Sequence, residues 1–459
     1  MACDTSSGKW RVWSRQALAR RRRSGRKAGI RRRQGRQARS FHVARLPRIA
    51  HNLPQGRPAP GRRGAATTRE TEMKRITRLS ALSAGLALAA APALAESIKV
   101  GVVMTLSGSA AVLGEQGRDG FLLALEELGG RIGGLEAEVV VVDDELKPDV
   151  AVNRARELVE SHKVDVVIGA MYSNVQMAIT GPLTEAGVFV LSPNPGPSAL
   201  AGAGCNPNFF AVSYQNDQPD EVVGAYVSDK AARVFLIAPN YQAGKDHLTG
   251  FKRTYTGEVA EELYVPLDQM DYSAELAQIA AAAPDAVYAF MPGGLGVNFV
   301  RQYRQAGLEA IPFYSTFTVD EVTLPAQKKD AVGFYSGGDW APDLDTDKNR
   351  AFVAAFEAKY DRVPASYAAH AYDAAYLLDA AVTAVGGDLS DKDALRAALK
   401  AADFESVRGE FAFGPNHFPL QDFYVTQVAE RPDGKFQTQI VEKVLEKPVD
   451  AYAAECPMK

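Results

Sequence analysis

Cysteine and histidine are scarce in this chain, and their spacing excludes several kinds of site. The 459 residues contain three cysteines, Cys3, Cys205 and Cys456, too few for a small scaffold held together by several disulfides. No histidine after residue 95 stands in metal-ligand spacing with another histidine or with a cysteine. These histidines are His162, His247, His370 and His417. We therefore expect no metal site.

The motifs of hydrolases and of nucleotide-binding proteins are also missing. No G-x-S-x-G sequence occurs, so an exported hydrolase would lack its nucleophile turn. The turn after the first expected strand, Leu106–Ser109, reads LSGS, without the G-x-G-x-x-G of a dinucleotide site. We therefore interpret the acidic residues 143–145 as a solvated strand end and not as a ribose-binding group. The sequence predicts neither a cofactor nor catalytic residues.

Long apolar runs and excess positive charge are absent from most of the chain. After residue 95 no apolar run reaches about 18 residues, so we expect no membrane-spanning helix. Residues 96–459 carry a net charge of −23, which argues against binding to nucleic acids or to anionic membranes. Residues 1–72 have the opposite character, with 18 Arg and 2 Lys against three acidic residues.

A secretory signal peptide begins at Met73, well inside the chain. Residues 73–78 are basic, residues 79–90 are apolar and rich in small side chains, and residues 93–95 form an A-x-A cleavage site. This order predicts Sec-type export to the periplasm with cleavage after Ala95. We interpret residues 1–72 as the product of a start codon assigned too far upstream. A disordered leader is the alternative, because a nucleic-acid-binding arm makes little sense on an exported protein.

Beyond the signal peptide, short apolar runs alternate with amphipathic stretches. Near-continuous runs of Val and Ile are typical of strands that helices cover on both faces, and the alternation predicts an α/β fold with a parallel, doubly wound sheet. The first unit has expected strands at Ile98–Met104, Val139–Val142, Val164–Ile168 and Val188–Leu191. Its expected helices are Gly114–Leu128, Val150–Ser161 and Val175–Glu185.

The same pattern repeats and then changes near the end of the chain. The second unit has expected extended segments at Phe209–Ser213, Val234–Ala238, Val259–Val265, Ala286–Phe290 and Phe313–Ser315. Its expected helices are Asp220–Asp229, Leu248–Thr254, Ala274–Ala282 and Val297–Gln305. Three further helices follow at Arg350–Lys359, Ala368–Val385 and Lys392–Ala401. Three antiparallel strands are expected last, at Gly409–Phe413, Phe423–Val428 and Gln437–Val441.

The ends of the expected strands carry hydroxyl, amide, glycine and aromatic residues. In open α/β sheets, ligands bind outside the carboxyl ends of the strands. Ser173-Asn174 lies where a strand meets a helix, and the free N–H groups of a helix N-terminus suit a carboxylate. The alternative is a simple helix cap, for which Ser and Asn are favoured in any case.

Two cysteines remain after the signal peptide, Cys205 and Cys456. An even number of cysteines in an oxidising compartment predicts one disulfide. Two unrelated thiols are the alternative.

An ordered set of short motifs resembles the leucine/isoleucine/valine-binding protein family, over about residues 96–445. The motifs are Ile98–Val102, Ser107-Gly108, Gly114, Gly133-Gly134-Leu135, Asp143-Asp144, Pro148, Val167–Gly169 and Leu191–Pro193. The resemblance implies a type I periplasmic solute-binding protein of an ABC transporter. It also implies two lobes, three crossovers that form the hinge, and ligand capture in the cleft by hinge closure.

The resemblance assigns ligand-binding roles to several residues. Ser173 corresponds to the serine that binds the ligand carboxylate, and the loop Asn194–Pro197 contributes further contacts, with Gly196 at the position of the family's threonine. Tyr241 corresponds to a tyrosine that covers the ligand. The amino-acid binders hold the ligand ammonium with an acidic residue, whereas this chain has Phe317 there. The full expected ligand-binding set is Leu113, Tyr172, Ser173, Asn174, Asn194, Gly196, Tyr241, Gly293 and Phe317.

The resemblance also divides the chain into lobes. Lobe 1 is expected to combine residues 96–214 and 343–420, and lobe 2 to combine residues 215–342 and 421–445. Residues 446–459 are expected to form a C-terminal tail, which the disulfide would tie back beside the first crossover.

The leading hypothesis is a monomeric, non-enzymatic binding protein that delivers a small carboxylate to an ABC permease. Because Phe317 replaces the acidic residue, an aromatic or branched aliphatic acid is favoured, and residues 194–218 resemble the subgroup associated with aromatic acids. A branched-chain amino acid is the alternative ligand. A sensory ligand-binding module is the alternative class, but it would need a transmembrane helix or an output domain.

The signal peptide generates the first testable prediction. N-terminal sequencing of the protein purified from the periplasm of its native host should begin at Glu96. Peptides from residues 1–72 recovered by mass spectrometry of that host would contradict the interpretation of a start codon assigned too far upstream.

Overall fold

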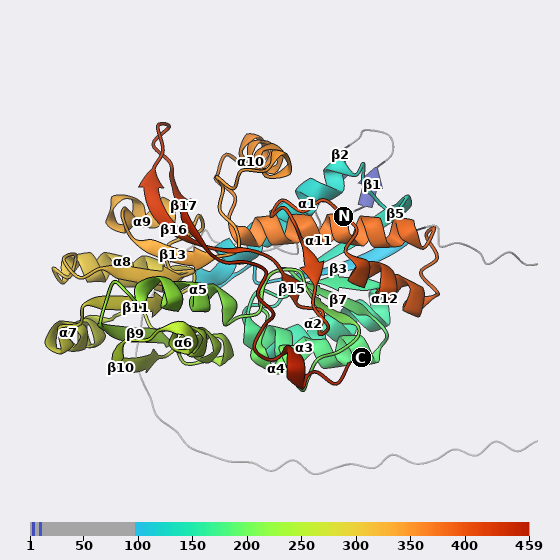
Figure 1. Ribbon diagram of the computed structural model, residues 1–459. Coiled ribbons are helices and arrows are strands. Elements are labelled where there is room, and N and C mark those ends of the chain that lie inside the picture. Colours follow the sequence, from blue (N-terminus) through green and yellow to red (C-terminus); the bar gives the residue numbers. More distant parts are fainter. Residues whose placement is uncertain (1, 5–8, 12–96, 459) are drawn as a thin grey trace, which may run out of the picture. The chain divides into compact units, whose positions relative to one another are not determined.

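The computed structural model describes residues 2–4, 9–11 and 97–458 (Figure 1). The predictions of a signal peptide in residues 73–95 and of cleavage after Ala95 lie outside the described residues, as does most of the basic segment 1–72. Within that segment, the short strands β1 (Ala2–Asp4) and β2 (Lys9–Arg11) pair antiparallel. From Ser97 onwards the chain builds two large β-sheets flanked by helices.

The first sheet has six strands in the order β4-β5-β3-β6-β7-β8. Every neighbouring pair is parallel except the hairpin of β4 and β5. The strands are β3 (Ser97–Met104), β4 (Arg131–Ile132), β5 (Leu135–Asp143), β6 (Val166–Ile168), β7 (Phe189–Ser192) and β8 (Phe209–Ala211). The helices between them are α1 (Ala111–Glu127), α2 (Pro148–Glu157), α3 (Ser173–Glu185) and α4 (Ser198–Ala201), with short helical turns at Gly108–Ala110 and Leu158–His162.

Helices cover both faces of this sheet. Helices α2 and α3 pack together on one face, while α1 packs against the later helix α11 (Ser366–Ala384) on the other (Figure 1). The contact between α1 and α11 is close because small residues line it. A Cβ atom at Gly120 would lie 2.2 Å from the carbonyl oxygen of Ala368, so a larger residue at position 120 would push the two helices apart.

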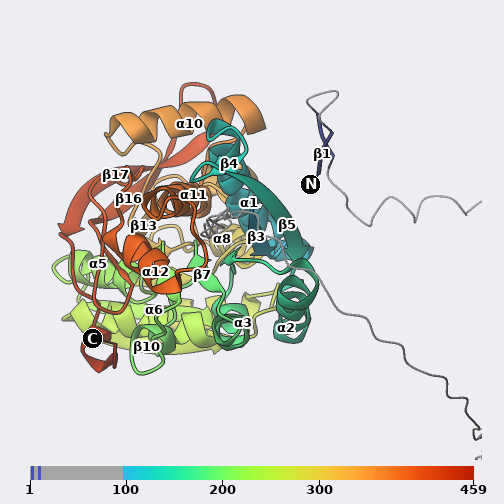
Figure 2. The same cartoon turned by 90° about the vertical axis from the view of Figure 1, so that its right-hand side faces the viewer.

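The second sheet has seven strands in the order β10-β9-β11-β12-β13-β16-β17. The first five are parallel, β16 pairs antiparallel with β13, and β17 pairs antiparallel with β16 at the edge of the sheet (Figure 2). The strands are β9 (Arg233–Pro239), β10 (Glu258–Val265), β11 (Ala286–Phe290), β12 (Phe313–Thr316), β13 (Tyr335–Gly338), β16 (Phe423–Glu430) and β17 (Phe436–Leu445). The flanking helices are α5 (Gln218–Val227), α6 (Gln242–Thr254), α7 (Ser273–Ala282), α8 (Gly294–Gln305) and α9 (Leu324–Gln327), followed by a turn at Lys328–Ala331.

The side chains of strand β9 explain why both of its faces are apolar. Successive side chains of a strand point to opposite faces. Val234 and Leu236 belong to the core that also contains residues of α5 and α6, whereas Phe235 and Ile237 belong to the core formed with α7 and α8. Because both faces of β9 are buried, the strand needs a continuous run of apolar residues, which is the pattern expected for a strand covered by helices on both faces.

The structure confirms the predicted two-lobed α/β fold and differs from the prediction near its end. No strand is predicted at Tyr335–Gly338, where β13 forms. In the structure, a Cβ atom at Gly337 would lie 2.2 Å from the carbonyl oxygen of Pro219, so glycine is needed where α5 crosses this strand. The expected strand Gly409–Phe413 is shorter than predicted: only β14 (Ala412–Phe413) forms, and it pairs with β15 (Pro419–Leu420) outside the second sheet.

Three segments connect the two sheet units. They lie between β8 and α5, between β13 and α10 (Asp347–Tyr360), and between β15 and β16. Helices α10, α11 and α12 (Lys392–Ala401) lie between the second and third of these crossovers, and α10 and α11 both pack against α1. The bounds of α12 are those that the sequence predicts.

A single buried guanidinium group contacts all three crossovers. Arg408 Nη1 donates hydrogen bonds to Ser213 O on the first crossover, at 3.0 Å, and to Asp339 Oδ2 on the second, at 3.3 Å. The same nitrogen donates to Gln421 Oε1 on the third crossover, at 2.7 Å. Arg408 Nε donates to Asp373 Oδ2 of α11 at 3.0 Å. Burial alone would raise the pKa of Asp339, but His370 and Arg408 beside it lower that pKa below its usual value.

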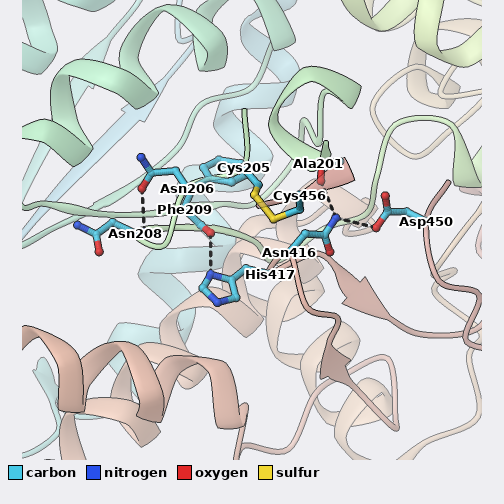
Figure 3. The surroundings of a disulfide bond; sticks show 9 residues. All are labelled: Ala201, Cys205, Asn206, Asn208, Phe209, Asn416, His417, Asp450 and Cys456. Carbon is cyan, nitrogen blue, oxygen red and sulfur yellow. Dashed lines mark hydrogen bonds between the residues drawn. A yellow bond between two sulfur atoms is a disulfide. The ribbon is translucent and has the colours of Figure 1, made fainter. Parts of the chain in front are cut away.

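The predicted disulfide is confirmed, and it fixes the C-terminal tail beside the first crossover (Figure 3). Cys205 follows α4 and is bonded to Cys456 at the end of the tail. Asn416 Nδ2 donates to Ala201 O and to Asp450 Oδ2, both at 2.9 Å. The tail also reaches the start of α5, where Gln218 Nε2 donates to Pro448 O at 3.0 Å, and its last turn is Ala453–Glu455. None of the described helices is both long and apolar enough to span a bilayer.

The Arg408 contacts generate the second prediction. Replacing Arg408 by methionine would leave the buried carboxylates of Asp339 and Asp373 without this cation, so the free energy of unfolding should fall by about 3–5 kcal/mol. Urea denaturation of the chain from Glu96 onwards measures this loss. The matched control is Arg350→Met, because Arg350 makes its two ion pairs at the surface and should cost about 0–1 kcal/mol. Equal losses in the two variants would contradict a special role for Arg408.

Candidate functional site

A cavity lies where the strand ends of the two lobes face one another. Together with the open solvent at its mouth, the space free of protein atoms there is about 290 Å³. The wall contributed by the first sheet unit and α11 consists of Leu113, Met171, Tyr172, Ser173, Asn194, Pro195 and Tyr367. The wall contributed by the second sheet unit consists of Tyr241, Ala243, His247, Phe290, Pro292 and Phe317. Tyr214 and Asn216 complete the lining from the first crossover.

The lining carries no Asp, Glu, Lys or Arg among the residues that the structure describes. A charged ligand group must therefore be stabilised by hydrogen bonds and helix dipoles, or it must stay in water. These neutral groups include N–H and O–H donors that suit a carboxylate. An ammonium group would find no carboxylate in the wall, and a buried charge without a partner costs several kcal/mol. The described residues also contain no group of three or more side chains placed to hold a metal ion.

Ser173 is the first residue of α3, directly after the extended residue Tyr172. The first N–H groups of a helix have no acceptor within that helix, and a helix N-terminus carries a partial positive charge. Ser173 Oγ accepts a hydrogen bond from Asn216 Nδ2 at 3.1 Å, so its own O–H can donate to another group. Asn216 Nδ2 also donates to Asp246 Oδ2 at 2.9 Å, which fixes the amide. Ser173 therefore offers a positioned donor to an anion.

Aromatic rings from both lobes form the walls around this donor. The rings of Tyr172 and Tyr241 both line the cavity and are tilted by 43° with centroids 6.2 Å apart, and Tyr241 stacks on Phe290 at 6.3 Å. Phe317 stacks on Tyr214 at 5.2 Å. Such spacings are those of favourable aromatic pairs. The cavity is therefore shaped for a ligand with a flat or compact apolar body.

The four tyrosine hydroxyls of the lining are neutral donors. Burial raises the pKa values of Tyr172, Tyr214, Tyr241 and Tyr367 above their usual value. Tyr214 donates to Asn194 Oδ1 at 2.7 Å, and Tyr367 donates to Asp320 Oδ2 at 3.2 Å. The hydroxyls of Tyr172 and Tyr241 have no hydrogen-bonding partner within the described residues, which leaves them available to a ligand.

The backbone of Phe317 has an unusual conformation. Its φ is +53°, a region that residues other than glycine seldom adopt. Such conformations persist only where the surroundings hold them, and they cluster at ligand sites. Phe317 follows strand β12 directly and is 95% buried. Its ring therefore forms a fixed part of the cavity wall.

Six of the nine predicted ligand-binding residues line the cavity. They are Leu113, Tyr172, Ser173, Asn194, Tyr241 and Phe317. Both polar atoms of the Asn194 side chain already bond to protein, since Nδ2 donates to Met171 O at 2.6 Å and Oδ1 accepts from Tyr214. One hydrogen of Nδ2 remains for a ligand.

The other three predicted residues, Asn174, Gly196 and Gly293, are not part of the described lining. Gly196 lies behind it, where its N–H donates to Asn216 Oδ1 at 2.9 Å. Gly293 lies opposite Leu113 of the other lobe, because a Cβ atom at position 293 would come within 2.9 Å of Leu113 Cδ1. Asn174 follows Ser173 in α3, and its Oδ1 is buried without a hydrogen-bonding partner.

Several lining residues have no predicted role. Asn216 lies in residues 194–218, which resemble the subgroup associated with aromatic acids, but the residue itself has no predicted contact with the ligand. Phe290 is the last residue of β11, so its place at a strand end was a usable signal. His247 and Tyr367 lie inside helices α6 and α11, and only the packing of those helices brings them to the cavity.

Polar contacts join the two walls beside the cavity. Ser198 Oγ, in α4, donates to Asp246 Oδ1 in α6 at 2.7 Å. Tyr367 of α11 bonds Asp320, which follows β12. Burial raises the pKa of Asp246 and raises that of Asp320 to about 7. Both carboxyl groups belong to the second sheet unit, lie behind the lining and bond to side chains of the opposite wall.

The sequence of the chain is similar to that of bacterial binding proteins. A family model described as periplasmic binding protein matches residues 97–435. Leu/Ile/Val-binding protein homolog 6 from Brucella melitensis is 28% identical over 384 residues, which cover 81% of this chain and 97% of the relative.

Solved structures share the fold. The solute-binding protein of an ABC transporter from R. palustris, solved in complex with benzoate, is 34% identical with a TM-score of 0.75, over 79% of this chain and 99% of that one. The substrate-binding protein of a branched-chain amino acid transporter from Streptococcus pneumoniae, solved with isoleucine, is 26% identical with a TM-score of 0.67. That match covers 75% of this chain and 100% of the other.

Proposed function

The chain belongs to the periplasmic binding protein family, and we propose that it captures a small aromatic carboxylic acid in the cleft between its lobes. The family is one of extracytoplasmic solute-binding proteins. The captured acid would be passed to the membrane permease of an ABC transporter. The observation that carries the proposal is a cavity that combines a helix N-terminus with aromatic walls and has no charged residue in its described lining.

The carboxylate would bind at Ser173. The hydroxyl of Ser173 and the first N–H groups of α3 supply donors, and the helix dipole favours a negative charge there. Tyr172 and Tyr241 carry further free hydroxyls within the same lining. The rest of the ligand would lie between the rings of Tyr241, Phe290 and Phe317. Asn194 would contribute from within the lining, and Asn174, Gly196 and Gly293 would support the site from beside or behind it.

An aromatic acid fits this site better than an amino acid does. An amino acid brings an ammonium group, which needs a carboxylate partner when it is buried. Phe317 fills the position from which the amino-acid binders supply that carboxylate. The R. palustris protein solved with benzoate is more similar to this chain than the S. pneumoniae protein solved with isoleucine. A branched aliphatic acid is the second candidate, because the same walls accept any apolar body. A branched-chain amino acid is the third, from the names of the sequence relatives.

The remaining features of the proposal concern export and organisation. The protein would be exported by the signal peptide in residues 73–95 and would act as a monomer without catalytic residues. The sheet of β3 to β8 would form lobe 1 with residues 343–420, and the sheet of β9 to β17 would form lobe 2 with residues 215–342 and 421–445. Residues 446–459 would remain a tail outside both lobes. Hinge closure would bring the two lobes together around the ligand.

The third prediction concerns the identity of the ligand. Calorimetric titration of the wild-type protein should detect binding of benzoate-type or hydroxycinnamate-type acids and little binding of leucine or valine. Phe317→Glu should weaken the binding of an aromatic acid by about tenfold or more, because it places an unpaired charge beside the ring. Phe317→Leu keeps the wall apolar and serves as the control, and it should cause a smaller loss of affinity for the aromatic acid. Tight binding of leucine by the wild type, with no binding of acids that lack an amine, would overturn the proposal.

The fourth prediction concerns the carboxylate. Ser173→Ala removes one hydrogen bond to a charged group, so the dissociation constant for the bound acid should rise about tenfold to a hundredfold. Ser273→Ala is the matched control, because Ser273 is the first residue of α7 and bonds Asp271 away from the cavity. The same titration measures both variants. An unchanged dissociation constant in Ser173→Ala would show that the carboxylate binds elsewhere.

A further inference from the structure

His247 is a polar group of the cavity wall that has no assigned role. It lies in helix α6 of lobe 2, its side chain is 98% buried, and it lines the cavity. Its ring stacks on Phe290 with centroids 3.7 Å apart and meets Phe317 edge to face at 5.9 Å. The imidazole is therefore part of the aromatic wall on the lobe-2 side of the cavity.

A second layer of side chains fixes the orientation of this ring. His247 Nδ1 is hydrogen-bonded to Asp220 Oδ2, and the other oxygen of Asp220 accepts from the hydroxyl of Tyr288. The Tyr288 hydroxyl oxygen in turn accepts from the hydroxyl of Thr316, with Oγ1 at 3.0 Å. Asp220 and Tyr288 are fully buried and do not line the cavity. The ring therefore cannot turn without breaking a buried hydrogen bond.

The second ring nitrogen, Nε2, is left for the cavity. The two nitrogens point in different directions from the ring, so a ring held through Nδ1 directs Nε2 away from Asp220. Within the described residues Nε2 has no hydrogen-bonding partner. Because His247 lines the cavity and Asp220 does not, the free nitrogen faces the space where the ligand would lie.

The charge state of His247 limits which ligand group suits it. Burial lowers its pKa to about 3 and raises that of Asp220 well above the usual value, so the imidazole is neutral at neutral pH. Depending on the tautomer, Nε2 of a neutral imidazole either donates or accepts one hydrogen bond. A hydroxyl group can do both and therefore pairs with Nε2 in either tautomer.

We propose that His247 Nε2 forms a hydrogen bond with a hydroxyl substituent on the ring of the ligand, and that it makes the site selective for hydroxylated aromatic acids. This inference rests on the proposed function and deepens it. The ligand would have two poles, a carboxylate at Ser173 on lobe 1 and a hydroxyl at His247 on lobe 2. A ligand held at both poles would bond to both lobes and so favour the closed state. An aromatic acid without the hydroxyl would leave Nε2 buried and unpaired, which lowers its affinity.

The test compares three acids on four proteins by calorimetry. The acids are benzoate, 3-hydroxybenzoate and 4-hydroxybenzoate. The proteins are the wild type, His247→Phe, His247→Gln and the control His417→Phe. Phenylalanine at position 247 keeps the stacking on Phe290 but removes Nε2, while glutamine keeps a neutral hydrogen-bonding group. His417 is also buried and stacked on a phenylalanine ring, Phe210 at 4.1 Å, but it does not line the cavity.

The wild type should bind at least one hydroxybenzoate about tenfold or more tightly than benzoate. His247→Phe should abolish this preference with little change in benzoate affinity, His247→Gln should keep part of it, and His417→Phe should keep all of it. Thermal melting checks that each variant is folded. Equal binding of the three acids by the wild type would overturn the inference, and so would an equal loss for all three acids in folded His247→Phe and His247→Gln. Either result is compatible with the proposed function. Binding of leucine and of none of the three acids would contradict both the inference about His247 and the proposed function.

Discussion

A buried charge needs a partner, and this constraint decides where the polar groups of the molecule lie. At the hinge, the guanidinium of Arg408 forms ion pairs with the carboxylates of Asp339 and Asp373, and the crossovers supply further acceptors to its Nη1. Removing one partner of a buried ion pair costs several kcal/mol of stability, because it leaves a buried charge unpaired. The three crossovers are therefore held at a common point.

The same constraint shapes the cavity. Three buried carboxyl groups, those of Asp220, Asp246 and Asp320, lie one layer behind its walls, and each is bonded to neutral hydroxyl, amide or imidazole groups. Burial raises the pKa of each. They orient His247, Asn216 and Tyr367, whose other faces line the cavity. The walls thus present oriented dipoles and aromatic faces without a net charge, which suits a ligand with one carboxylate at a helix N-terminus and an apolar body.

Much of this architecture was predictable from the sequence because strands buried on both faces and their amphipathic helices repeat with a clear period. Strand β11 and helix α12 were predicted at their observed bounds. Strand β13 was not, because it ends in two glycines, which carry no strand signal, and the first of them, Gly337, is required by the close approach of α5. In the site, Ser173 and Tyr241 were predictable because they follow strand ends, whereas Phe317 was expected there only from the family resemblance. His247 and Tyr367 were not, because a position inside a helix does not reveal which surface it reaches after folding. The partner of His247, Asp220, belongs to another helix, α5.

We propose that the cleft accepts a carboxylate attached to an apolar body and has no place for an ammonium group. A matched pair of ligands tests it most directly, because 3-phenylpropanoate and phenylalanine differ only by the α-ammonium. Their dissociation constants should be measured by calorimetry on one preparation of the wild-type protein. 3-Phenylpropanoate should bind at least about a hundredfold more tightly than phenylalanine, because burying an unpaired ammonium costs several kcal/mol of binding free energy. Equal or tighter binding of phenylalanine would contradict it.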